Sequence, residues 1–226
     1  MAGTITALKI QKRNRNRVNV YLDEHYGFSL ADHLAVPLRQ GQFLSDEEIA
    51  RLEEEDEYHH VYRRAVKLID HRPRSIAEVR QRMERQGVAA DLIEKVIEQL
   101  TAIGLLDDAE FARLWVENRE TFRPRSHRML RYELRQKGLD EKTIAQALEQ
   151  IDEEQSAHRL AHQRAHRLSR LDWPAFRQKL TGYLARRGYS YEVARRAVRE
   201  AWQCLLESDD DILHNCRESE EEEWTC

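Results

Sequence analysis

Hydrophobic residues along most of the chain recur at the spacing of amphipathic helices. In the middle of the chain, Phe111, Leu114 and Trp115 share one helical face, and Leu130 and Leu134 share the face of the next helix. Charged residues fill the positions between them. This pattern predicts a helical body with one apolar face on each helix.

The pattern itself recurs about every 50 residues. A shift of −51 relates Ser126, Leu130, Leu134 and Gly138 to Ser75, Val79, Met83 and Gly87. A shift of +50 relates Leu130, Leu134 and Gly138 to Leu180, Leu184 and Gly188. A fixed period of this length indicates a helical repeat, and we expect each unit to need its neighbour to bury its apolar face.

The first 44 residues follow a different pattern. Apolar and polar residues alternate over 5–12 and 17–23, which predicts two strands, and 26–30 can add a third. We therefore predict a mainly α protein, a tandem array of three three-helix repeats in a curved solenoid, preceded by a small N-terminal β-hairpin or three-stranded meander. The predicted segments are an N-terminal β-hairpin extension at 1–44, an acidic linker helix at 45–56, helical repeats at 57–104, 105–152 and 153–206, and a disordered acidic tail at 207–226.

Charge is distributed unevenly along the chain, although the net formal charge is only −4. Residues 44–57 carry a net charge of −7 and residues 207–226 carry −8, whereas residues 58–206 carry +8. A basic body favours an acidic partner, either nucleic acid or an acidic protein surface. The alternative is a well-solvated helical surface, since 35% of the residues are charged.

No catalytic or nucleotide-binding motif such as GxGxxG, GxSxG or HExxH occurs in the chain. We expect a protein that is not an enzyme and has no catalytic residue, cofactor or metal. His158, His162 and His166 have a spacing that can place two imidazoles on one metal, but solvated histidines are the favoured interpretation. Three cysteines without paired spacing, and no signal peptide or membrane-length apolar run, predict a cytoplasmic protein, which we expect to be a monomer without membrane contact.

Basic residues crowd the two Arg-Pro-Arg-Ser corners and the helices that follow them. On one such helix Arg128, Arg131 and Arg135 lie along a stripe away from the apolar face. Because a guanidinium group can bind carboxylate or phosphate through two hydrogen bonds, these stripes predict partner binding; the alternative is pairing with neighbouring acids such as Glu133 and Glu78. The candidate partner-binding residues are Arg74, Arg80, Arg123, Arg125, Arg128, Arg131, Arg135, Lys137, Arg186 and Arg187. At the predicted hairpin turn, the candidate contact residues are Lys12, Arg13, Arg15 and Arg17.

Several of these motifs together resemble the family of the bacterial regulatory protein RecX. The matching stretches are Gly104-Leu-Leu-Asp-Asp-Ala-Glu-Phe-Ala-Arg-Leu-Trp-Val116, Pro124-Arg-Ser, Glu133-Leu-Arg-Gln-Lys-Gly-Leu139 and Arg74-Ser75-x-x-Glu78-Val79-Arg80. The resemblance covers about residues 58–203. It implies a modulator, mostly an inhibitor, of the RecA recombinase. Such a modulator lies along the RecA filament on single-stranded DNA and opposes ATP hydrolysis, strand exchange and repressor cleavage. Several family members also bind DNA, and a sequence-independent nucleic-acid-binding module is the alternative function.

Overall fold

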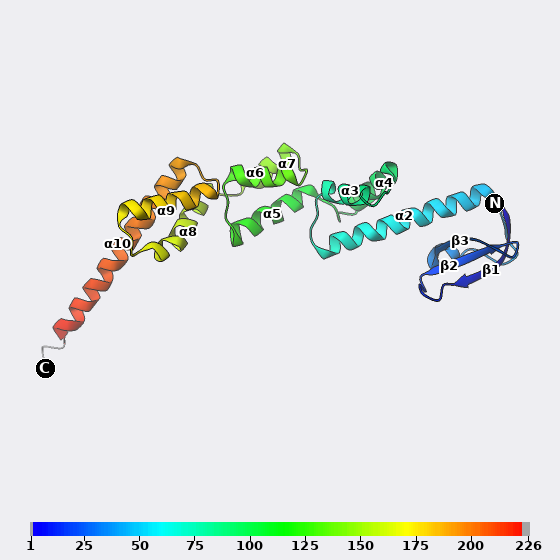
Figure 1. Ribbon diagram of the computed structural model, residues 1–226, viewed down its shortest axis with the longest axis horizontal. Helices are drawn as coiled ribbons and strands as arrows, with labels where there is room; N and C mark the ends of the chain where they lie inside the picture. Colours follow the sequence, from blue (N-terminus) through cyan, green and yellow to red (C-terminus); the bar gives the residue numbers. More distant parts are fainter. Residues whose placement is uncertain (1, 223–226) are drawn as a thin grey trace. The chain divides into compact units, whose positions relative to one another are not determined.

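The structure, a computed structural model, describes the backbone of residues 2–222 and the side chains of residues 2–207 (Figure 1). It divides into two compact units, one ending at Leu106 and the other beginning at Asp107. Both are mainly helical, and all the strands among the described residues lie in the unit that ends at Leu106. The predicted fold class, helical repeats preceded by a small antiparallel strand group, is confirmed.

The N-terminal strands form one antiparallel sheet in the order β3-β2-β1-β4. Its members are β1 (Gly3–Ile10), β2 (Arg17–Leu22), β3 (His25–Ala31) and β4 (Phe43–Leu44). The fourth strand was not predicted, because two residues that pair with Gly3 and Thr4 are too few to show an alternating pattern. Asp23 and Glu24 connect β2 to β3 with φ angles of 47° and 72°, the left-handed backbone that a tight two-residue hairpin requires.

A single helix, α2 (Asp46–His71), follows the sheet and the short helix α1 (Asp32–Ala35). It begins with a capping box between Ser45 and Glu48. The sequence predicts two helices here, an acidic one and then the first helix of repeat 1. The structure joins them, because no glycine or proline interrupts residues 46–71.

The two halves of α2 pack against different partners. Ile49 and Leu52 in its first half join the buried face of the sheet, together with Ile5, Val20 and Leu30. Its second half packs instead on α3 (Ile76–Glu84) and α4 (Ala90–Ala102), where its buried residues are Val61 and Ala65. Helix α2 therefore belongs to both the sheet and the first three-helix unit.

Two further three-helix units follow. The second consists of α5 (Asp108–Phe122), α6 (His127–Gln136) and α7 (Glu141–Glu149), and the third of α8 (Glu153–Ala165) with the 3-10 turn η1 (His166–Leu168), α9 (Trp173–Arg186) and α10 (Tyr191–Glu222). Side chains of Ser75, Ser126 and Asp172 cap the middle helices α3, α6 and α9.

Positions related by the sequence repeat are structurally equivalent. At two equivalent positions each middle helix buries an apolar side chain to an exposed fraction of 1% or less, namely Val79 and Met83, Leu130 and Leu134, and Leu180 and Leu184. The three glycines that end these helices have φ angles of 76°, 80° and 93°, for Gly87, Gly138 and Gly188. The predicted register of the repeat is confirmed.

The prediction that each unit depends on its neighbour for its core is wrong. Among the described residues, the buried hydrophobic side chains form four separate clusters, one on the sheet and one inside each three-helix unit. Three helices can enclose a core by themselves, which a two-helix repeat cannot. Contacts between the second and third units include polar ones: Glu120 on α5 accepts hydrogen bonds from Ser156 and Arg159 on α8.

The backbone of α10 is helical as far as Glu222, whereas the sequence predicts a disordered acidic tail from residue 207. Extending a helix that is already packed costs no new nucleation, and glutamate is a good helix former. Residues 223–226 of the predicted tail lie outside the described residues.

Candidate partner-binding surfaces

The basic residues of the α5–α6 corner divide into paired and unpaired groups. Arg123 and Arg128 are exposed, and neither has an ion pair in the described part of the chain. Arg131 and Arg135 instead both contact Glu141 at the start of α7, with N–O distances of 2.8 and 2.6 Å. The predicted stripe therefore consists of one unpaired arginine and two that connect neighbouring helices.

Arg125 and Lys137 take part in a cluster around Glu133, a carboxylate with a side chain only 14% exposed. Glu133 accepts hydrogen bonds from Trp115 Nε1 at 2.9 Å and from Arg119 at 2.7 Å, and Arg125 lies 3.0 Å away. Lys137 lies 4.8 Å from the centre of the Trp115 ring, a cation–π contact. For Arg125 the structure thus favours the alternative interpretation, pairing with a neighbouring acid.

The candidates of the first unit are similarly engaged. Arg80 forms a bidentate pair with Glu94, at 2.7 and 2.9 Å, and these hydrogen bonds hold the pKa of Glu94 below its ordinary value. Arg74 is half-buried, and its guanidinium group donates a hydrogen bond to the carbonyl of Leu68. Burial, followed by the charge of Arg72, lowers the pKa of this group.

In the third unit Arg186 is exposed, whereas Arg187 contacts the second unit. Its guanidinium group donates to the carbonyl of Pro124 at 3.3 Å and to the Tyr183 hydroxyl at 3.2 Å. Arg187 therefore connects the end of α9 to the corner before α6, a structural contact that sequence spacing does not indicate.

At the β1–β2 loop, Lys12, Arg13 and Arg15 are exposed and have no ion pair within the described residues. Arg17, which follows the loop, points instead toward α2. Its guanidinium group lies 2.8 Å from the Asp56 carboxylate and also donates to the carbonyl and hydroxyl of Ser29. Asp56 is 8% exposed and accepts a further hydrogen bond from the Ala31 N–H, at 2.7 Å.

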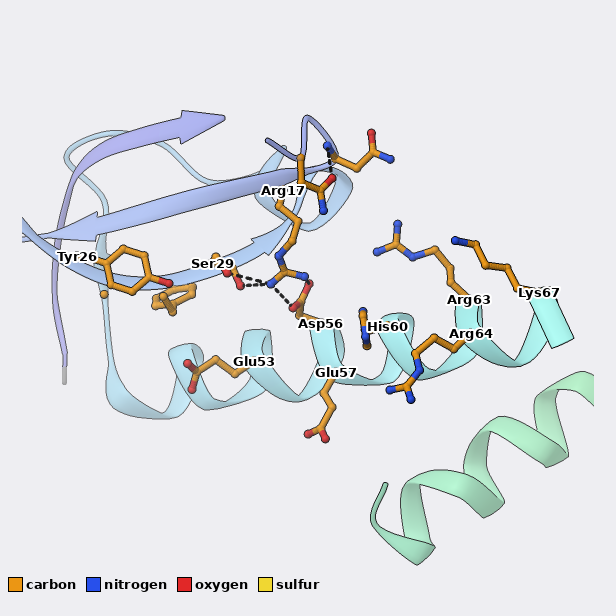
Figure 2. A pocket seen from close by; sticks show the side chains of 14 residues that line it. Arg17, Tyr26, Ser29, Glu53, Asp56, Glu57, His60, Arg63, Arg64 and Lys67 are labelled. Atoms are coloured by element: carbon orange, nitrogen blue, oxygen red, sulfur yellow. Dashed lines mark hydrogen bonds and ion pairs between the residues drawn. The ribbon is translucent and has the colours of Figure 1, made fainter. Parts of the chain in front are cut away.

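This Arg17–Asp56 pair lies in a groove of about 850 Å³ between the sheet and α2 (Figure 2). Figure 2 shows Arg63 and Lys67 extending from α2 on the side of the β1–β2 loop, while Glu57 and Arg64 point away from that side. Arg63 and Lys67 are exposed, one helical turn apart, and have no ion pair in the described structure. Sequence reasoning missed them, because only the fold of the sheet onto α2 brings them near the basic loop.

We find no metal centre among the described side chains. No group of three histidine, cysteine or carboxylate residues is arranged to hold an ion there. His158, in the predicted histidine stripe, forms an ion-pair contact with Glu200 of α10. No helix in the described part of the chain is both long and apolar enough to cross a membrane.

Comparison with known proteins shows which relatives this chain has. The regulatory protein RecX of Clostridium botulinum is 30% identical over 204 residues, covering 87% of this chain and 95% of that protein. That of Bacillus licheniformis is also 30% identical, over 87% of this chain and 76% of its own. The chain belongs to the RecX family.

RecX domain models match the chain in order. The RecX N-terminal domain matches residues 3–39, and the first, second and third three-helix domains match 62–100, 107–148 and 152–198. These three domains coincide with the three-helix units described above. A crystal structure of regulatory protein RecX shares the fold, with a TM-score of 0.67 and 24% identity, over 86% of this chain and 98% of that one.

Proposed function

We propose that this RecX-family protein binds the RecA recombinase filament on single-stranded DNA and restrains its ATPase, strand-exchange and coprotease activities, thereby regulating DNA repair. Membership of a family of regulatory proteins is the observation that carries the proposal. The protein would act in stoichiometric amounts, through surface contacts and without chemistry of its own.

Unpaired cations support a role as a binding surface. Arg123, Arg128 and Arg186 are exposed and have no carboxylate within ion-pair distance in the described structure. A cation already paired with a neighbouring acid must lose that pair to bind a partner, whereas an unpaired one needs only to shed water. The unpaired arginines are therefore the favoured contact residues, and the paired Arg80, Arg125, Arg131 and Arg135 serve chiefly to hold helices together.

The test uses the RecA protein of the same organism, assembled on single-stranded DNA. We expect ATP hydrolysis to slow, and filaments seen by electron microscopy to shorten, as this protein approaches a stoichiometric ratio to RecA. Unchanged hydrolysis and filament length at an equimolar ratio would contradict the proposal.

A second candidate function, sequence-independent nucleic-acid binding, is favoured by the basic β1–β2 loop. Asn14 and Asn16 of this loop line the same groove as Arg63 and Lys67. Lys12, Arg13 and Arg15 are their neighbours in the chain, and none of these five cations has an ion pair within the described residues. Binding by such a surface releases counterions, so its affinity falls steeply with salt. If a K12E/R13E/R15E variant binds single-stranded DNA as tightly as the unchanged chain at low salt, the loop is not a nucleic-acid contact.

A further inference from the structure

All the charged residues that line the groove between α9 and α10 are basic. Its volume is about 710 Å³, and its lining contains three arginines, Arg177, Arg195 and Arg199, and no acidic residue. By comparison, the lining of the groove beside the sheet contains three acidic residues, Glu53, Asp56 and Glu57, in addition to its basic residues.

All three arginines of this α9–α10 groove are available for a ligand. They are exposed, and none has a hydrogen bond or ion pair within the described residues. The acids of α10 nearest in sequence are engaged elsewhere, since Glu192 pairs with Arg196 and Glu200 with His158. The positive charge of the groove is therefore not neutralised by any described side chain.

Helical spacing places an aromatic ring at one end of each wall. On α10, Tyr191, Arg195 and Arg199 are four residues apart, and on α9 Trp173 precedes Arg177 by the same interval. Trp173 is partly buried against Phe176 and Trp202, which holds it in place. Tyr191, at the first position of α10, is 73% exposed.

We infer that the α9–α10 groove binds a short segment of single-stranded nucleic acid. The arginines contact successive phosphates, and an unpaired base stacks on Tyr191. A duplex has no free base face to stack, and an acidic peptide leaves the exposed ring without a planar partner. This site is separate from the proposed RecA contact and from the β1–β2 loop, and it is tested without RecA.

The first test removes charge from the groove. In R195Q/R199Q, the slope of log affinity for a fluorescent oligo-dT against log salt should fall by about 1.4, since each phosphate contact to a single strand contributes about 0.7. Arg196→Gln is the matched control: it removes one cation from the same helix, but that cation pairs with Glu154 and Glu192 at 3.0 and 2.8 Å. An unchanged slope for R195Q/R199Q, or an equal loss per residue in the control, overturns the inference.

The second test leaves charge unchanged. Tyr191→Ala should weaken oligo-dT binding about tenfold through loss of a stacked base, while Tyr191→Phe retains it. Gly182→Leu should fill the groove and weaken binding as well; the site has room for a side chain, because an added Cβ meets only Arg186 Nη1, at 3.5 Å. Thermal melting checks that each variant remains folded.

The third test distinguishes the ligand classes and locates the contact. An oligonucleotide containing 5-iodouracil should cross-link to Tyr191 or Trp173 on irradiation, as read by mass spectrometry of the full chain. A poly-glutamate peptide should not compete with it at equal charge concentration. Competition by poly-glutamate that persists in Tyr191→Ala, or cross-links found only at the β1–β2 loop, would show that the α9–α10 groove is not a nucleic-acid site.

Discussion

The backbone of Gly188, at the end of α9, lies so close to Ser126, at the start of α6, that a Cβ atom on Gly188 would be 2.5 Å from Ser126 Oγ. The Ser126 N–H also donates to the carbonyl of Arg187, at 3.1 Å. The capping serine of one unit and the terminal glycine of the next therefore form a close contact between the second and third units.

Gly188→Ala should destabilise the protein more than the equivalent change at Gly87. Both glycines have positive φ, which costs about 1 kcal/mol for a residue with a side chain. An added Cβ at Gly87 meets no atom within 4 Å, whereas at Gly188 it would also collide with Met129. We expect losses of about 1 kcal/mol for Gly87→Ala and about 2–4 kcal/mol for Gly188→Ala in urea unfolding. Equal losses of stability for the two variants would mean that Ser126 and Met129 move aside at little cost.

Asp56→Ala should loosen the sheet from α2. The change leaves the Arg17 guanidinium group and the Ala31 N–H without their shared acceptor, at an expected cost of about 3 kcal/mol. Glu54→Ala on the same helix is the control, since its carboxylate is 72% exposed and reaches only Lys95; we expect less than about 0.5 kcal/mol. The free energy of unfolding in urea measures both. Similar values for the two variants would show that the Arg17–Asp56 pair contributes little.

Charge reversal should separate the unpaired from the paired arginines of the α5–α6 corner. R123E/R128E should weaken inhibition of the RecA ATPase about tenfold without lowering the melting temperature, because neither side chain has an ion-pair partner among the described residues. R131E/R135E should instead lower the melting temperature, because two new carboxylates would lie beside Glu141. If only R131E/R135E weakens inhibition, and its melting temperature is unchanged, then the paired arginines are the residues that contact RecA.

Tyr189→Phe should change how stability depends on alkaline pH. Burial, followed by the nearby charge of Glu120, raises the pKa of the Tyr189 phenol well above its ordinary value. In the unfolded chain it ionises near pH 10, so its contribution to stability is full below about pH 10 and is lost as the pH rises further. Phenylalanine cannot ionise, and the variant should lose less stability between pH 9 and pH 11.

At pH 7 the same variant should be neutral or more stable by about 1 kcal/mol, because the buried Tyr189 hydroxyl has no hydrogen-bond partner among the described residues. Tyr191→Phe, at an exposed position, is the control and should leave both values unchanged. A loss of more than about 1 kcal/mol at pH 7 for Tyr189→Phe would show that the hydroxyl does make a stabilising contact.

The sequence alone determined most of the helices and the repetition of the three-helix unit. Apolar spacing identifies Leu130, Leu134 and their equivalents as core residues, because a helix with one buried face must repeat that face every three or four residues. Capping serines and terminal glycines mark the helix ends for the same local reason. Such features depend on residues a few positions apart, so they can be predicted without knowledge of the tertiary structure.

Only the tertiary structure decided which charges are free. Arg128 and Arg131 look alike in the sequence, yet Glu141 of the next helix pairs with one and not the other. Arg177 and Arg199 lie 22 positions apart and share a groove because α9 and α10 pack together. A charge is neutralised by whatever lies within a few ångströms, and that neighbour is set by how helices pack, which residue spacing does not encode.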